Sequence, residues 1–105
     1  MNVDDLMEKI VDFDWDEGNI NKSFVKHGIT NKESEQTFFN FKQVLPDSLH
    51  SFAEQRHRIL GVTDKGKILS SSFTVRGKKI RIISSRLASK RERSNYEKAQ
   101  KNSQI

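Results

Sequence analysis

The sequence contains no cysteine, so neither a disulfide framework nor a thiolate metal site can form. Its five glycines are isolated from one another, and no glycine-rich phosphate loop is present. The first 17 residues lack a basic region and a long apolar run, which argues against a signal peptide or a transmembrane helix. We therefore expect a cytoplasmic protein that makes no contact with a membrane.

Patterns typical of metal sites are lacking as well. The three histidines, at positions 27, 50 and 57, share no ligand spacing, and the aspartates near the N-terminus lack the glycine of a calcium loop. No segment resembles the nucleophile elbow of a serine hydrolase. We expect neither a metal ion nor another cofactor.

Hydrophobic residues make up only 33% of the 105 positions, which is enough for one modest core. Seven phenylalanines and one tryptophan must supply much of it. Because no repeat, low-complexity tract or linker divides the chain, we expect a single domain spanning residues 1–105.

Charge is distributed unevenly along the chain. Residues 1–17 carry seven acids and one base, residues 18–55 carry four of each, and residues 56–105 carry fourteen Lys/Arg and three acids. The C-terminal half therefore has a balance of +11, which favours a polyanionic partner at that half. A merely basic, soluble surface is the alternative interpretation.

Helix signals are concentrated in residues 14–40. Asp14 or Asp16 is expected to cap a helix over residues 17–26 that stops at Gly28, in a left-handed conformation. Thr30 and Glu33 form a capping box that opens a second helix, running to about Asn40. We expect the aromatic cluster at its end to belong to the core: Phe38, Phe39 and Phe41.

Strand patterns dominate from residue 43 onward, after a short one at 11–15. Segments 43–45, 55–63, 68–75 and 78–85 read as strands, with a turn at 46–47, a loop at 47–54 and tight turns at 64–66 and 76–77. We expect an α+β fold, with two N-terminal helices packed on an antiparallel β-meander and a C-terminal helix.

The run from Ile80 to Tyr96 carries the clearest functional signal. Alternation at 80–82 predicts a strand, and Ser89 followed by Glu92 is a capping box that opens a basic helix. Arginine presents a planar fork of donors, so several positions in this run can each hold a phosphate oxygen: Arg81, Arg86 and Arg93. A wet sheet face and a solvated helix face are the alternative explanations.

The same run, IRIISSRLASKRER-x-x-Y, resembles the C-terminal signature of the BrnT family, the ribonuclease toxins of bacterial type II toxin–antitoxin systems. Three further segments agree in order and spacing: residues 13–16, 26–29 and 55–61. Gln55 and His57 depart from the family, which commonly has a glutamate and an aromatic residue there. The departure puts a carboxylate role at position 55 in doubt.

The resemblance implies a RelE-like fold, an RNA substrate and a cognate antitoxin. That antitoxin would be BrnA-like, with a ribbon-helix-helix part that binds operator DNA, so the toxin would reach DNA only through it. Cleavage would be metal-independent, because RNA carries its own nucleophile in the 2′-hydroxyl.

Residue types suggest how such chemistry would be divided. The arginines suit charge stabilisation at the scissile phosphate, and His57 titrates near neutral pH, so we expect four catalytic residues: Arg56, His57, Arg81 and Arg86. Further residues are candidates for RNA contact: Lys26, His27, Lys90, Arg91, Arg93 and Tyr96. His57 can instead be a tolerated core or rim residue, and His27 can simply complement a helix dipole.

Two functions from different classes follow. The first is an endoribonuclease toxin that inhibits growth and translation and is neutralised by its antitoxin. The second is a non-catalytic nucleic-acid-binding module that uses the same basic surface.

Overall fold

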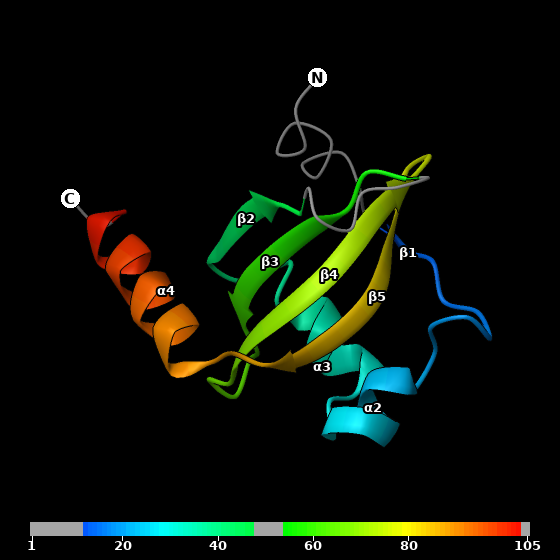
Figure 1. Cartoon of the computed structure of the whole chain (residues 1–105), viewed down its shortest axis with the longest axis horizontal. Coiled ribbons are helices and arrows are strands. Elements are labelled where there is room, and N and C mark those ends of the chain that lie inside the picture. The colour runs from blue at the N-terminus through cyan, green and yellow to red at the C-terminus, as the bar shows by residue number, and fades with distance from the viewer. Residues whose placement is uncertain (1–11, 48–53, 104–105) are drawn as a thin grey trace.

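In a computed structural model of the protein, residues 12–47 and 54–103 are described. They form one sheet of five strands and three helices (Figure 1). In chain order the elements are β1 (Asp12–Phe13), α2 (Lys22–His27), α3 (Asn31–Gln36), β2 (Lys42–Pro46), β3 (His57–Val62), β4 (Ile68–Arg76), β5 (Lys79–Leu87) and α4 (Lys90–Asn102). No helix within these two ranges is long and apolar enough to span a membrane.

The sheet has the strand order β1-β5-β4-β3-β2. Strands β2 to β5 pair antiparallel with their sequence neighbours, whereas β1 pairs parallel with β5. The sheet is therefore mixed, and the predicted fold class, two helices on an antiparallel meander, is wrong. The parallel pair joins residues more than sixty positions apart, Asp12 with Lys79 and Phe13 with Ile80.

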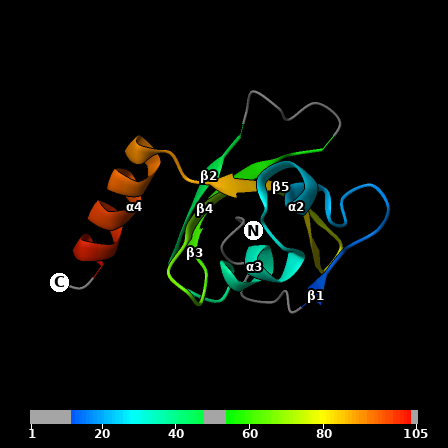
Figure 2. The same ribbon diagram turned by 90° about the horizontal axis from the view of Figure 1, so that it is seen from below.

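The N-terminal helices also differ from the prediction. Each has six residues; α2 buries none of its side chains, and α3 buries only Ser34. In Figure 2, α3 lies beneath the sheet, while α2 lies level with β5, the strand that it contacts. They do not form a packed two-helix layer.

Asn19 explains why the first helix starts late. Its side-chain amide donates to the carbonyls of Asp14 and Ile82, both at 2.9 Å, and its Oδ1 accepts from the N–H of Asp16 at 2.8 Å. Residues 14–19 are thus tied to the edge of β5 instead of joining a helix. The predicted caps, Asp14 and Asp16, are wrong, because the N-cap is Asn21, at φ 59°.

Several local predictions are confirmed. Gly28 ends α2 at φ 73°, and both capping boxes form, Thr30 with Glu33 and Ser89 with Glu92. Pro46 is not in a turn but ends β2, an edge strand, where a missing N–H is tolerated. The predicted strand residue Val11 and most of the expected loop at 47–54 lie outside the described residues.

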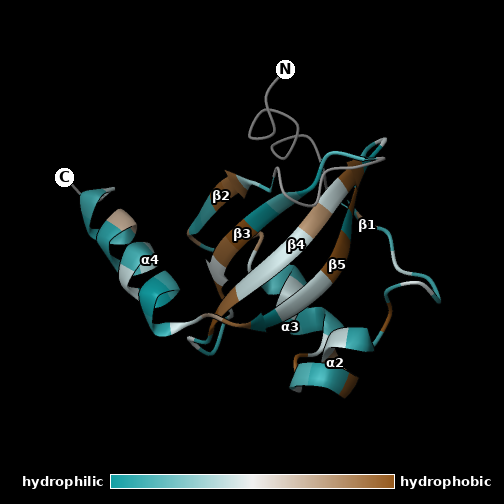
Figure 3. Ribbon diagram, in the orientation of Figure 1, coloured by the Kyte–Doolittle hydropathy of each residue, from teal (hydrophilic) through white to brown (hydrophobic). Residues whose placement is uncertain are grey.

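Two hydrophobic clusters occupy opposite faces of the sheet. On the face covered by α3, a core forms from Phe38, Ile59, Phe73, Ile80 and Ile82. On the other face, where α4 lies, Tyr96 and Ala88 pack against Leu60. Figure 3 shows brown, hydrophobic segments on the strands and mostly hydrophilic colours on the helices. Of the three phenylalanines expected in the core, Phe39 is exposed.

Candidate functional site

A β-bulge determines which side chains of β5 share a face. The register pairs Ser72 with Ser84 but Phe73 with Ile82, which leaves Ile83 as the extra residue. Residues five positions apart on a regular strand point to opposite faces, and one extra residue reverses that relation. Arg81 and Arg86 therefore project from the same face, opposite Thr74 and Ser70.

We call this side of the sheet the arginine face. Ser70, Ser72 and Thr74 of β4 form its central row, and all three are buried. Four arginines flank this row: Arg58 on β3, Arg76 on β4, and Arg81 and Arg86 on β5. It is the face opposite the core of Phe73 and Ile82, and α4 packs over part of it, beside β2 and β3.

Arg81 lies at one end of the arginine face and is paired with acids. Its Nη2 donates to Asp16 Oδ1 at 2.8 Å, and its Nη1, which is buried without a hydrogen bond, lies 3.6 Å from Asp14 Oδ2. The guanidinium and the Gly18 N–H lower the pKa of Asp16. A Cβ at Gly18 would lie 2.6 Å from Arg81 Nη2, so glycine permits the loop to approach this closely.

Arg76 is the second arginine at this end. Its guanidinium binds Glu54 through two hydrogen bonds, of 2.9 and 2.6 Å, and Thr74 also donates to Glu54, at 3.2 Å. The hydrogen bonds from Arg76 are the main reason that the pKa of Glu54 is lowered to about 2. Two guanidinium groups thus face three carboxylates, a local balance of −1.

Arg86 lies at the other end of the face, beside the start of α4. Its Nη1 and Nη2 donate to the two carboxylate oxygens of Glu92, at 2.7 and 3.2 Å. Glu92 also accepts from the Ser89 N–H at 2.8 Å and from Ser70 Oγ at 3.1 Å. Burial acts to raise the pKa of Glu92, but these hydrogen bonds outweigh it and lower the pKa to about 2.

Arg58 was not among the predicted site residues. Its Nη1 donates to Ser72 Oγ at 3.0 Å and its Nη2 to Ser70 Oγ at 2.5 Å. Arg58, Arg86 and Glu92 therefore give this end of the face a balance of +1. Strand alternation was the signal that could have identified Arg58. Neighbouring residues of a strand point to opposite faces, and His57 lies opposite Phe73 on the core face, so Arg58 points to the arginine face.

The predicted catalytic residues are only partly brought together. Arg81 and Arg86 lie opposite residues four positions apart on β4, roughly 13 Å at about 3.3 Å per residue, and their guanidinium groups bind different carboxylates, so they do not converge on one phosphate. The His57 ring packs 5.3 Å from that of Phe73, and burial lowers its pKa, which favours the neutral form. Arg56 precedes β3, and its carbonyl accepts from the Asp47 N–H.

The predicted RNA-contact residues are likewise divided. Lys26 and His27 are exposed in the last turn of α2, and three residues are exposed at the start of α4: Lys90, Arg91 and Arg93. Tyr96 is only 2% exposed; its hydroxyl donates to the Phe41 carbonyl at 2.8 Å. The start of α4 is thus the part of this set that directly adjoins Arg86.

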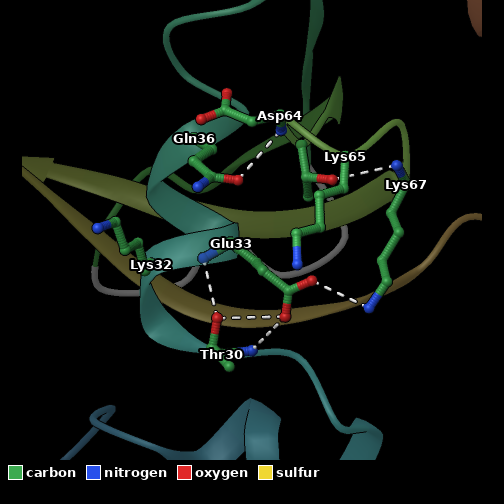
Figure 4. A pocket seen from close by; sticks show the side chains of 8 residues that line it. Thr30, Lys32, Glu33, Gln36, Asp64, Lys65 and Lys67 are labelled. Atoms are coloured by element: carbon green, nitrogen blue, oxygen red, sulfur yellow. Dashed lines mark hydrogen bonds and ion pairs between the residues drawn. The ribbon is translucent and has the colours of Figure 1, made fainter.

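A polar pocket of about 560 Å³ lies elsewhere, between α3 and the β3–β4 turn (Figure 4). Lys67 forms an ion pair of 3.0 Å with Glu33, and the Asp64 N–H donates to Gln36. None of the predicted site residues lines this pocket. Across residues 12–47 and 54–103, no three His, Asp or Glu side chains are grouped closely enough to hold a metal ion.

Comparison with known proteins gives one family. The model of a family described as "Ribonuclease toxin, BrnT, of type II toxin-antitoxin system" matches residues 15–92. The matched span contains all four arginines of the arginine face and ends at Glu92. No curated protein matches the chain.

Proposed function

Because the chain belongs to the BrnT family of ribonuclease toxins of type II toxin–antitoxin systems, we propose that it cleaves RNA internally, without a metal ion, and inhibits growth. A cognate antitoxin would neutralise it. The observation that carries the location of the site is the net positive charge where Arg58 and Arg86 meet the start of α4. A phosphate is attracted to that end and repelled by the acid-rich end around Arg81.

Arg86 is the residue that we propose for charge stabilisation at the scissile phosphate. Its bidentate bond to Glu92 holds the guanidinium in place, because Glu92 is itself held by the helix cap and by Ser70. A preorganised donor needs little rearrangement when charge develops on a non-bridging oxygen. The RNA supplies the nucleophile through its 2′-hydroxyl, so the protein need only orient and stabilise.

Exposed cations at the start of α4 extend the binding surface beyond Arg86. Lys90, Arg91 and Arg93 carry three positive charges within one turn of helix. We propose that they contact phosphates flanking the cleaved bond, which provides affinity without base recognition. If about four cations of this surface contact a single strand, log K against log salt should have a slope of roughly −3.

Cleavage of an end-labelled single-stranded RNA in the presence of EDTA tests the proposal. We expect the wild-type protein to cut internally, and Arg86→Lys to cut about a hundredfold more slowly, because an ammonium cannot make the bidentate contact. Arg76→Lys is the matched control, since Arg76 is bound to Glu54 at the other, acid-rich end of the face. Circular dichroism reports whether each variant is folded.

Three results would contradict parts of the proposal. Cleavage only after Mg²⁺ is added would refute metal independence, and full activity of Arg86→Lys would refute the role of Arg86. Tight RNA binding without any cleavage would instead support the non-catalytic module. Inducible expression with and without the antitoxin gene tests growth inhibition and neutralisation together.

A further inference from the structure

Arg58 differs from the other arginines of the arginine face in its partners. Arg76, Arg81 and Arg86 each bind a carboxylate, whereas the guanidinium of Arg58 is bound by two hydroxyl groups. No carboxylate of residues 12–47 or 54–103 lies within 4 Å of Arg58 in an ion pair. Its positive charge is therefore not neutralised by this part of the chain.

Ser70 and Ser72 hold the guanidinium in a defined orientation. Ser70 donates its single hydroxyl proton to Glu92, so its oxygen is left to accept from Arg58. Both serines are buried, at 1% and 7% exposure, and they project from the central strand β4. A neutral acceptor on a rigid strand positions an arginine without cancelling its charge.

Arg58 also retains donors for a ligand. A guanidinium has five N–H groups, and two of them are used for the serines. The remaining three N–H groups have no acceptor among the described residues. No nitrogen of Arg58 is buried without a hydrogen bond, so these groups are open to a ligand. Three donors beside an uncompensated charge suit an anion with several oxygens.

We propose that Arg58 is a phosphate-binding residue for RNA, which places the substrate strand across β3, β4 and β5. The inference rests on the proposed ribonuclease function and adds a contact to it. Arg58 and Arg86 lie on the two strands that flank β4, opposite Ser72 and Ser70, so their backbones are about 12 Å apart at roughly 4.8 Å per strand and 3.3 Å per residue. An RNA strand that crosses β4 can therefore place one phosphate at each arginine.

An acidic side chain of a partner protein is the competing anion. RNA is favoured because the hydrogen-bonded chain Arg58–Ser70–Glu92–Arg86 joins this residue directly to the arginine proposed for catalysis. A ligand of Arg86 that continues along the face therefore reaches Arg58 next.

Binding of a fluorescein-labelled, 2′-O-methylated single-stranded RNA tests the proposal, because this RNA cannot be cleaved. We expect Arg58→Gln to bind about tenfold more weakly than the wild type and to reduce the salt slope by about 0.7, the value for one phosphate contact. Arg76→Gln, which removes a carboxylate-paired arginine from the same face, is expected to leave the slope unchanged. Arg58→Lys, which keeps the charge, should retain the slope and lose part of the affinity.

An unchanged slope and affinity in folded Arg58→Gln would overturn the inference. So would a loss of antitoxin binding with RNA binding intact, since the anion would then belong to the partner. Failure of the wild-type protein to bind or cleave any RNA would refute the proposed function itself, which is a separate result. If Arg58→Gln unfolds, the change in slope between the wild type and Arg58→Ser decides the question in the same way.

Discussion

Glu92 should contribute a pH-dependent part of the stability that can be isolated by mutation. Its side chain is 23% exposed, and its carboxylate accepts four hydrogen bonds, two from Arg86 and one each from Ser70 and Ser89. Together they lower its pKa from 4.5 to about 2 despite burial, which raises it. Since one pKa unit corresponds to about 1.4 kcal/mol, the ionised form is favoured in the folded protein by about 3 kcal/mol.

The direction of the pH dependence follows from that difference. The folded-state pKa lies below the ordinary value, so the contribution is fully present above pH 4.5 and is lost as the pH falls towards 2. In Glu92→Gln the side chain cannot ionise. The free energy of unfolding of this variant should therefore be lower by about 3 kcal/mol at pH 7, and the gap to the wild type should close in acid.

Urea denaturation followed by circular dichroism at several pH values between 2.5 and 7 measures this gap. Glu54, whose pKa is also lowered to about 2, loses its own contribution in the same window, but it is present in both proteins and cancels in the difference. Glu97→Gln, on an exposed position of the same helix, is the control. A gap that stays constant from pH 7 to pH 2.5 would refute the reasoning.

Two further predictions concern packing and the partner. Gly61→Ala should destabilise the fold by about 1–3 kcal/mol, because the new Cβ would lie 2.8 Å from Thr37 Cβ and 2.9 Å from the Thr37 carbonyl oxygen. RNA cleavage by the purified variant at low temperature should be unaltered, and an unchanged melting temperature would contradict this packing. The antitoxin should cover the arginine face or the basic start of α4 with an acidic segment, so higher salt should slow association more than it speeds dissociation. Reversing the charge of the exposed cations at the start of α4, Lys90, Arg91 and Arg93, should weaken that complex without unfolding the toxin. A complex that leaves these residues unprotected in hydrogen exchange would contradict the prediction.

Local structure was the part of the fold that sequence patterns predicted best. The two capping boxes formed as expected because each needs only residues three positions apart, a distance set by the helix itself. The strands β3 to β5 lie close to the predicted segments, since alternation and tight turns are also local signals. Gly28 ended its helix for the same kind of reason, its tolerance of positive φ.

Non-local contacts caused the errors. The helix predicted over residues 17–26 was shortened because Asn19 bonds to the carbonyl of Ile82, a contact between distant parts of the chain. The sheet is mixed because β1 pairs in parallel with the free edge of β5. Neither event leaves a signal in the residues flanking it.

The candidate site divides in the same way. The sequence by itself determined that arginines precede a capped basic helix, that the C-terminal half is strongly positive and that the chain resembles BrnT toxins, because composition, spacing and motifs require no knowledge of contacts. Only the tertiary structure decided that a bulge at Ile83 puts Arg81 and Arg86 on one face. It also decided which charges are paired: Asp14 and Asp16 neutralise Arg81, whereas within the described residues the charge of Arg58 is bound only by hydroxyl groups. The physical reason is that register and charge pairing depend on which strands and loops meet in space, and the Arg81–Asp16 pair spans 65 positions of the chain.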